Sequence, residues 1–261
     1  MEKLSVYMIT LNEEKRLEET LKAASRVADE IIIVDSGSTD RTEAIAKKYN
    51  AVFVYNKWKS FSAQKQVAQN LCENRYVMNL DADEVLSEDL IAEIKALKEN
   101  FSADAYRVRV KDMYPGWKKP RRLGRTYNII RLYNRDHMDM PDDYSNDRPV
   151  PLHENVKTGQ LKAPVLHYSY IDLTQRIAKW NKYSSEFMKT AKGKKKKYSS
   201  LRLITEFPVQ FLRYYLIKRY IFCGFYGFVE SMTSAYFRFV KIAKFREEEI
   251  FERENENKKT P

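Results

Sequence analysis

The apolar positions in the first hundred residues fall into short runs, which alternate with longer stretches whose apolar residues recur at helical spacing. The short runs predict buried strands at 4–10, 30–34, 51–55 and 76–80. The longer stretches predict helices at 13–28, 39–49, 61–72 and 87–99. Strands that alternate with helices of this length form βαβ units. We therefore expect an α/β fold with a mostly parallel sheet flanked by helices.

The pattern changes after residue 101. Alternating polar and apolar residues and one more apolar run predict later strands at 105–111, 128–134 and 163–168. A basic loop is expected at 115–122, and a loop rich in Asp and Pro at 138–151. From residue 173 onward the chain is expected to be helical.

The net charge of +11 is unevenly distributed. Residues 1–175 hold 27 basic and 27 acidic residues, so the remainder of the chain carries the whole excess. This asymmetry predicts a neutral body with a basic appendage that faces an anionic partner, either anionic lipid or nucleic acid. We expect a folded domain, a basic helical region and a charged, disordered tail at 1–170, 171–246 and 247–261.

The two cysteines, Cys72 and Cys223, lie far apart in dissimilar contexts. They predict neither a disulfide framework nor a metal site, so a reducing compartment fits best. The chain starts directly with a strand pattern, and no cleavable signal is expected. Because no stretch of about 18 uncharged apolar residues occurs, we expect no membrane span.

Polar clusters follow three of the predicted strands, at 10–13, 35–40 and 81–83. In parallel sheets ligands bind at the carboxyl ends of strands, so these clusters are expected to meet at one edge. Asp81 and Asp83 can hold a divalent cation such as Mg²⁺ or Mn²⁺, which in turn can hold a diphosphate. The alternative is an acidic turn that caps the helix starting at Ser87.

Asp35 directly follows the second strand. Its carboxylate can accept the imide N–H of a uracil or contact a ribose hydroxyl, whereas the alternative is turn and helix-cap chemistry shared with Ser38 and Asp40. The first strand is not followed by a G-x-G-x-x-G sequence, and no Walker-type G-x-x-x-x-G-K sequence occurs.

The segments at 9–14, 29–40 and 81–84, in this order and spacing, resemble family 2 glycosyltransferases. The overall pattern is most similar to bacterial glycosyltransferases of lipopolysaccharide core assembly, including β-glucosyltransferases. The resemblance implies a GT-A fold and inverting transfer from a nucleotide-diphospho-sugar, with a UDP-sugar such as UDP-glucose the expected donor. It also implies a nucleotide-binding part at 1–100 and an acceptor part at 101–170.

The resemblance further implies roles for individual residues. Asp83 would ligate the metal, Asp81 would be a further ligand or reach the ribose or metal-bound water, and Glu84 would support the helix start or the metal ligands. His167 would be another metal ligand; the alternative is a hydrogen-bonded structural histidine. Lys65 stands where many relatives carry an arginine; the alternative is an exposed helix lysine. The residues expected to contact the nucleotide-sugar are Thr10, Leu11, Asn12, Glu13, Asp35, Lys65, Asp81, Ala82 and Asp83.

Inverting transfer needs one base on the acceptor side, and Glu154 is the expected base. The alternative is a surface glutamate beside a neutral histidine. Rival carboxylates lie on the acidic loop, and they are Asp142, Asp143 and Asp147. Arg131 and the pair Arg121 and Arg122 can steer the diphosphate or an acidic acceptor; the alternative is ordinary alternation on an exposed strand.

Two stretches of the appendage predict contact with an anionic membrane surface. Residues 189–197 hold six lysines, and 207–245 mix aromatic and basic residues on an amphipathic helix. The alternative is a helical hairpin packed on the domain. We expect a cytoplasmic protein, peripheral on the inner face of the membrane, acting on a lipid-linked saccharide. The oligomeric state stays open.

Two other functions remain as alternatives. One is transfer of a sugar to polyprenyl phosphate, although enzymes of that subclass often carry extra hydrophobic spans. The other is nucleic-acid binding through the basic region, which no recognised motif supports, so no nucleic-acid partner is expected.

Overall fold

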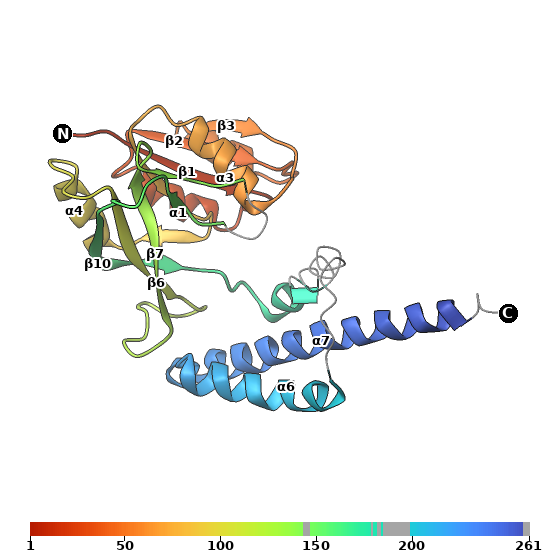
Figure 1. Ribbon diagram of the computed structural model, residues 1–261. Helices are drawn as coiled ribbons and strands as arrows, with labels where there is room; N and C mark the ends of the chain where they lie inside the picture. The colour runs from red at the N-terminus through yellow and green to blue at the C-terminus, as the bar shows by residue number, and fades with distance from the viewer. Residues whose placement is uncertain (143–146, 179, 182–183, 185–198, 258–261) are drawn as a thin grey trace. The chain divides into compact units, whose positions relative to one another are not determined.

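The computed structural model describes residues 1–142, 147–178, 180–181, 184 and 199–257. The chain forms two compact units (Figure 1). The first comprises Met1–Met113 and Thr126–Ser169, and the second comprises Tyr114–Arg125 and Tyr170–Pro261. The predicted basic loop at 115–122 therefore groups with the carboxyl-terminal helices, and not with the domain into which the sequence places it.

The first unit is built on an eight-stranded sheet with the strand order β3-β2-β1-β4-β7-β6-β10-β5. Only β7 and β5 run antiparallel to their neighbours. The strands are β1 (Leu4–Thr10), β2 (Glu30–Asp35), β3 (Val52–Tyr55), β4 (Tyr76–Asn79), β5 (Glu84–Leu86), β6 (Ala105–Asp112), β7 (Thr126–Asn134) and β10 (Thr158–His167). The predicted α/β class with a mostly parallel sheet is confirmed.

Helices cover both faces of this sheet because alternate strand residues point to opposite sides. On β2, Ile31 and Ile33 join the same core as α1 (Leu17–Ala24), α2 (Thr42–Lys48) and α4 (Glu88–Leu97). Ile32 and Val34 join the core on the other face, where α3 (Phe61–Asn70) packs against β1 and β2 (Figure 1). The apolar runs of the sequence are thus strands buried on both faces.

Several elements differ from the sequence predictions. The loop predicted at 138–151 contains a short antiparallel pair, β8 (Met138–Asp139) and β9 (Val150–Pro151). The last strand begins at Thr158, earlier than the predicted 163, because its first half pairs with β6. The residues directly after Asp83 form a strand, since β5 pairs with β10.

The second unit contains a helical hairpin of α6 (Ser200–Leu212) and α7 (Gly224–Asn257), which lie side by side (Figure 1). A π-helical turn, Arg213–Ile217, and a 3-10 turn, Tyr220–Cys223, connect them. The segment 247–257, predicted to be disordered, continues α7 as helix. Among the described residues, no helix is long and apolar enough to cross a membrane.

Candidate active site

The ends of β1 and β2 are tied together by hydrogen bonds between the two loops that follow them. Asn12 adopts a left-handed φ of 56°, which asparagine tolerates. Its N–H donates to Ser38 Oγ at 2.7 Å, and its Oδ1 accepts the Thr39 N–H at 2.9 Å. The Glu13 N–H donates to Thr42 Oγ1 at 2.9 Å. Two polar clusters predicted to meet are therefore in direct contact.

The Asp35 carboxylate is buried beneath these loops and organises them. Oδ1 accepts hydrogen bonds from Thr10 Oγ1 at 2.7 Å and Ser38 Oγ at 2.6 Å, while Oδ2 accepts the N–H groups of Gly37 and Ser38 at 2.8 and 2.7 Å. A carboxylate offers about four lone-pair positions, and these contacts use them. Direct contact of Asp35 with a base stays a prediction. In the structure, Asp35 holds the loop after β2 in place.

Asp81 lies at the end of β4 between two buried cations. Lys65 Nζ is 3.0 Å from Oδ1, and Arg131 Nη2 is 2.8 Å from Oδ2. Burial alone raises the pKa of Asp81, but the charges of Arg131 and Lys65 outweigh burial and hold this pKa well below its ordinary value. The alternative interpretation of Lys65 as an exposed helix lysine is wrong, because α3 turns Lys65 toward Asp81 and buries it. Contact of Lys65 with the nucleotide-sugar stays a prediction.

Glu84 is fully buried behind Asp81. Its Oε2 accepts the Asp81 N–H at 3.1 Å, and its Oε1 pairs with Arg131. Arg131 also donates to Asn79 Oδ1 at 2.8 Å. Burial raises the pKa of Glu84, and the nearby Arg131 charge opposes that rise. This geometry agrees with the supporting role expected for Glu84. Arg131 is buried and contacts Asn79, Asp81 and Glu84, so it is not an exposed strand residue.

Asp83 and His167 face each other next to this cluster. His167 Nε2 is 3.5 Å from Asp83 Oδ1, and His167 Nδ1 is 3.2 Å from Asp112 Oδ1. Burial lowers the pKa of His167, but the hydrogen bonds to Asp112 and Asp83 raise it to about 10. Burial raises the pKa of Asp83, yet the contacts of His167 and of Arg16, whose Nη1 is 3.1 Å from Oδ2, lower it overall.

This pair fits a divalent cation by its chemistry. A metal-binding histidine commonly has its second ring nitrogen held by a carboxylate, and Asp112 holds Nδ1 of His167 in this way. A carboxylate oxygen suits Mn²⁺ or Mg²⁺, whereas the imidazole nitrogen, which binds a metal only after losing its proton, suits Mn²⁺ better than Mg²⁺. The predicted set of three ligands is not formed, because the described residues contain no group of three or more such side chains able to hold one ion. Asp81 is instead engaged by Lys65 and Arg131.

Three partners in this cluster escaped sequence reasoning, and they are Arg16, Asp112 and Tyr168. Asp112 ends β6 just as His167 ends β10, and the two strands pair in parallel with these residues opposite each other. The Tyr168 N–H donates to the Asp83 carbonyl at 2.8 Å. The only signal in the sequence was the position of Asp112 at the end of a predicted strand. Ala82 is buried, and its carbonyl accepts Thr20 Oγ1 at 2.9 Å.

The structure separates Glu154 from this site. Glu154 precedes β10, whose opposite end carries His167. Its neighbour His153 contacts His137 at 2.7 Å, and Lys157 N–H donates to Asp104 at the start of β6. A ten-residue strand spans roughly 30 Å, so Glu154 lies at the edge of the sheet opposite to Asp83. The expectation that Glu154 is the base is therefore corrected.

Two described carboxylates of the acidic loop, Asp142 and Asp147, lie on the side of Asp81 instead. Asp142 lies 2.6 Å from Lys59 Nζ, just before α3, and Asp147 lies 3.6 Å from Lys65 Nζ, which also contacts Asp81. The Lys65 ammonium thus lies between the carboxylates of Asp81 and Asp147, and the Asp147 side chain is more than half exposed. Asp143 lies outside the described residues.

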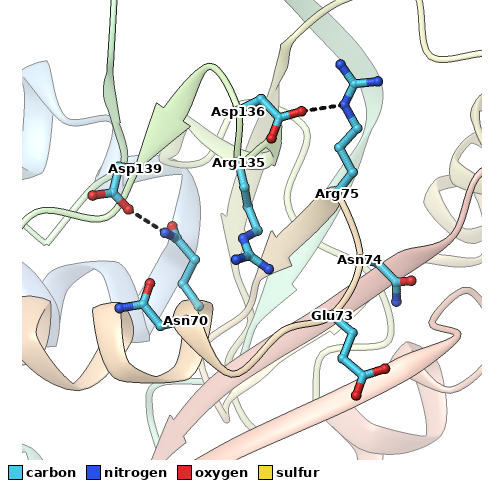
Figure 2. Close-up of a pocket in the computed structure, with 8 residues that line it drawn as sticks. Asn70, Glu73, Asn74, Arg75, Arg135, Asp136 and Asp139 are labelled. Carbon is cyan, nitrogen blue, oxygen red and sulfur yellow. Dashed lines mark hydrogen bonds and ion pairs between the residues drawn. The ribbon is translucent and has the colours of Figure 1, made fainter.

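Two cavities mark the two edges. A cavity of about 240 Å³ opens beside Asp83 and is lined by Lys15, Arg16, Glu19, Thr20, Asp83, Val85 and Tyr168. The other, of about 440 Å³, lies at the opposite edge, where Arg75 pairs with Asp136 and Gln69 pairs with Asp139 (Figure 2). The smaller cavity borders Asp83 and is lined by the basic residues Lys15 and Arg16, so it is the candidate for an anionic ligand at the carboxyl edge of the strands.

Residues 5–151 match the family model described as Glycosyl transferase family 2. An uncharacterized glycosyltransferase of Rickettsia typhi is 36% identical over 260 residues, covering 95% of this chain and 88% of that protein. The lipopolysaccharide core biosynthesis glycosyltransferase LpsC of Rhizobium meliloti is 32% identical over 262 residues, covering 92% and 91%. Among solved structures, S. aureus TarS 1–349 is 13% identical with a TM-score of 0.47, covering 94% of this chain and 91% of that one.

Proposed function

This chain belongs to glycosyl transferase family 2, and on that premise we propose that it transfers a hexose from a nucleotide-diphospho-sugar to a lipid-linked saccharide. The proposed donor is a UDP-sugar such as UDP-glucose, and the proposed acceptor is the lipopolysaccharide core or a similar surface glycan. The likeness to LpsC supports this acceptor class. The observation that carries the proposal is the Asp83–His167–Asp112 arrangement at the carboxyl edge of the parallel strands.

Asp83 and His167 are the proposed holders of Mg²⁺ or Mn²⁺, with Asp112 orienting the imidazole. A cation bound there would supply positive charge next to the leaving diphosphate. Lys15 and Arg16, which line the cavity beside Asp83, would add charge on the same side. The loop formed by 10–13 and 36–42 would hold the nucleoside, because it is the adjoining part of the same sheet edge.

Asp147 replaces Glu154 as the proposed base. Asp147 contacts Lys65, which in turn contacts Asp81 at the sheet edge that carries Asp83. Its carboxylate is more than half exposed, so an incoming acceptor can reach it. As the acceptor oxygen forms its bond to the anomeric carbon, its proton passes to the Asp147 carboxylate. The bond from that carbon to the diphosphate breaks with its electron pair on the diphosphate. Attack opposite to the leaving group inverts the anomeric centre.

A thermal-shift panel tests donor and metal together. UDP-glucose, UDP-galactose, UDP-N-acetylglucosamine and GDP-mannose are each added with and without Mn²⁺. A ligand at about 100 times its Kd stabilises the native state by about 2.7 kcal/mol, or roughly 5–10 °C in Tm for a domain of this size. We expect a UDP-sugar to raise Tm, and Mn²⁺ to enlarge the rise.

Two variants make the panel specific. Asp83→Ala is expected to lose the Mn²⁺-dependent part of the shift, whereas Asp136→Ala, at the opposite edge, is expected to keep it. Truncated lipopolysaccharide and polyprenyl phosphate are then offered as acceptors, and NMR of the product reports the anomeric configuration. A protein whose Tm responds to no nucleotide-sugar would refute the proposed function, and glucosylation of polyprenyl phosphate alone would replace the acceptor.

A further inference from the structure

The turn between α6 and α7 presents large apolar side chains to solvent. We call residues 212–225 the hairpin tip. Ile217 and Phe225 are 75% and 74% exposed. The other exposed apolar side chains of the hairpin tip are Leu212, Leu216, Ile221 and Phe222. Six of the fourteen residues of the hairpin tip are thus large, apolar and exposed, whereas ordinary surfaces carry such residues singly.

The backbone of the hairpin tip holds these side chains outward. Arg219 and Gly224 have positive φ values of 65° and 58°, which reverse the chain direction. The inner side is filled by Tyr220 and Cys223, both buried. A Cβ on Gly227 would lie 1.8 Å from the Tyr220 carbonyl oxygen, so only glycine allows this close approach. Tyr220 and Cys223 thus occupy the inner side of the hairpin tip, while the exposed apolar residues lie on its outer side.

The basic loop at 115–122 packs in the same unit as the hairpin tip, although it lies about a hundred residues earlier in the chain. The Arg125 Nη1 donates to Tyr220 Oη at 2.9 Å, and the rings of Tyr114 and Tyr226 stack with centroids 5.0 Å apart. The loop exposes four more cations, namely Lys118, Lys119, Arg121 and Arg122. Two segments of like composition thus come together only through folding.

The charge of this surface has one sign. Neither 114–125 nor 207–229 contains an acidic residue. The flanking acids are buried and paired: Glu206 with Arg202 and Arg238, and Glu230 with Arg176. The hairpin tip exposes three cations, Arg213, Lys218 and Arg219, which with the four of the basic loop make seven. A surface that combines apolar tips with unopposed cations matches a bilayer containing anionic lipids.

We propose that the hairpin tip and the basic loop form a docking surface for an anionic bilayer, with the apolar side chains of the tip in the headgroup region. Docking beside a lipid-linked acceptor rests on the proposed function, whereas vesicle binding itself involves no glycosyl transfer. The six lysines at 189–197, which the sequence analysis assigned to the membrane, lie outside the described residues and form no part of this surface.

Co-sedimentation with vesicles tests the surface. Phosphatidylcholine vesicles are compared with vesicles that also contain phosphatidylglycerol, and binding is expected only to the latter. Each basic residue near an anionic surface contributes about fivefold in affinity, so glutamine at Lys118, Lys119, Arg121 and Arg122 is expected to weaken binding at least a hundredfold. The paired substitution Ile217→Ser and Phe225→Ser is expected to weaken binding at least tenfold, because it removes the most exposed apolar side chains of the tip.

Matched control variants remove the same number of apolar or basic side chains from parts of the protein outside the proposed surface. Ile250→Ser with Phe251→Ser removes two exposed apolar residues near the other end of α7. Glutamine at Lys3, Lys22, Lys47 and Lys95 removes four exposed lysines of the first unit. Both controls are expected to bind as the parent does, with circular dichroism and Tm verifying that every variant folds.

A tryptophan added at the tip gives a second measurement. In anionic vesicles only, brominated acyl chains are expected to quench Phe225→Trp more strongly than the parent, which already holds Trp58, Trp117 and Trp180. Equal loss of binding in the control variants, equal binding to neutral vesicles, or absence of this additional quenching would overturn the proposed surface. Absence of vesicle binding together with a dimer in sedimentation equilibrium, lost in Ile217→Ser with Phe225→Ser, would assign the same surface to a second copy of the chain.

Discussion

His167 and Asp83 face each other because two strands of opposite direction pair beside them. The imidazole Nε2 lies 3.5 Å from the Asp83 Oδ1, and β5 and β10 pair in a register that sets His167 opposite Glu84. The Tyr168 N–H closes the arrangement on the Asp83 carbonyl at 2.8 Å. Main-chain hydrogen bonds thus hold the backbone of the two proposed metal ligands side by side.

Asp112→Asn is expected to weaken Mn²⁺ binding by roughly 10–100-fold, because the amide no longer orients His167 as a carboxylate does. Calorimetric titration of Mn²⁺ in the presence of UDP measures the change. Asp104→Asn is the matched control, since Asp104 also lies beside a histidine, His137, but at the opposite edge. Unchanged Mn²⁺ affinity in Asp112→Asn would remove Asp112 from the site.

Asp147→Asn is expected to lower kcat by about 10²–10⁴-fold, because the acceptor hydroxyl loses the group that takes its proton. Donor binding should change little, since Asp147 lies toward the solvent side of Lys65. Steady-state kinetics and the thermal shift with UDP-sugar separate the two effects. Glu154→Gln is the paired measurement and is expected to keep turnover; a collapse of kcat in that variant alone would restore Glu154 as the base.

Asp29→Asn is expected to destabilise the first unit by about 1–2 kcal/mol at neutral pH, because it leaves the buried Lys98 ammonium without its carboxylate. Burial raises the pKa of Asp29, but the contacts of Lys98 and of the Leu4 N–H lower it overall. A lowered folded-state pKa means that this stabilisation is present above about pH 4 and is lost as the pH falls through the folded value.

The sign of this linkage is measurable by chemical denaturation at about pH 6 and about pH 3. The parent protein is expected to lose more stability across this interval than Asp29→Asn, because the variant has no carboxylate to protonate. Equal losses in both proteins would show that Asp29 contributes nothing to the acid dependence.

Cys72 is expected to react with thiol reagents roughly a thousandfold more slowly than free cysteine at about pH 8. Burial raises the pKa of its thiol to about 12, and Sγ donates to the Ala68 carbonyl at 3.4 Å. The rate is followed in a Cys223→Ala background, so that one thiol is counted. Full reaction in urea provides the control, and rapid labelling of the folded protein would contradict the burial of Cys72.

Much of the first unit could be predicted from local pattern. The apolar runs that became β1, β2 and β4 are buried on both faces, and their short length together with the flanking turn residues identifies such runs as strands. The elements that were missed, β5, β8 and β9, have two or three residues each. They exist because a distant partner strand pairs with them, and a local pattern carries no such information.

The positions of Glu154 and Lys65 in the structure also could not be predicted from local sequence patterns. The sequence places both near motifs of known type but does not say at which edge of the sheet a segment returns. The chain after β7 turns back at His137, so Glu154 falls at the amino-terminal edge. Conversely, α3 places Lys65 against Asp81. Lysine is normally exposed, but this lysine is buried and paired with a carboxylate.

The sequence by itself determined the α/β class, the family and the clusters that meet at Asn12, Asp35 and Asp81, because parallel strands necessarily bring their carboxyl ends to one edge. Only the tertiary structure decided which side chains contact Asp83 and which loop joins the hairpin tip. Those relationships depend on strand register and on packing between segments far apart in the chain, as with His167 beside Asp83 and Arg125 on Tyr220.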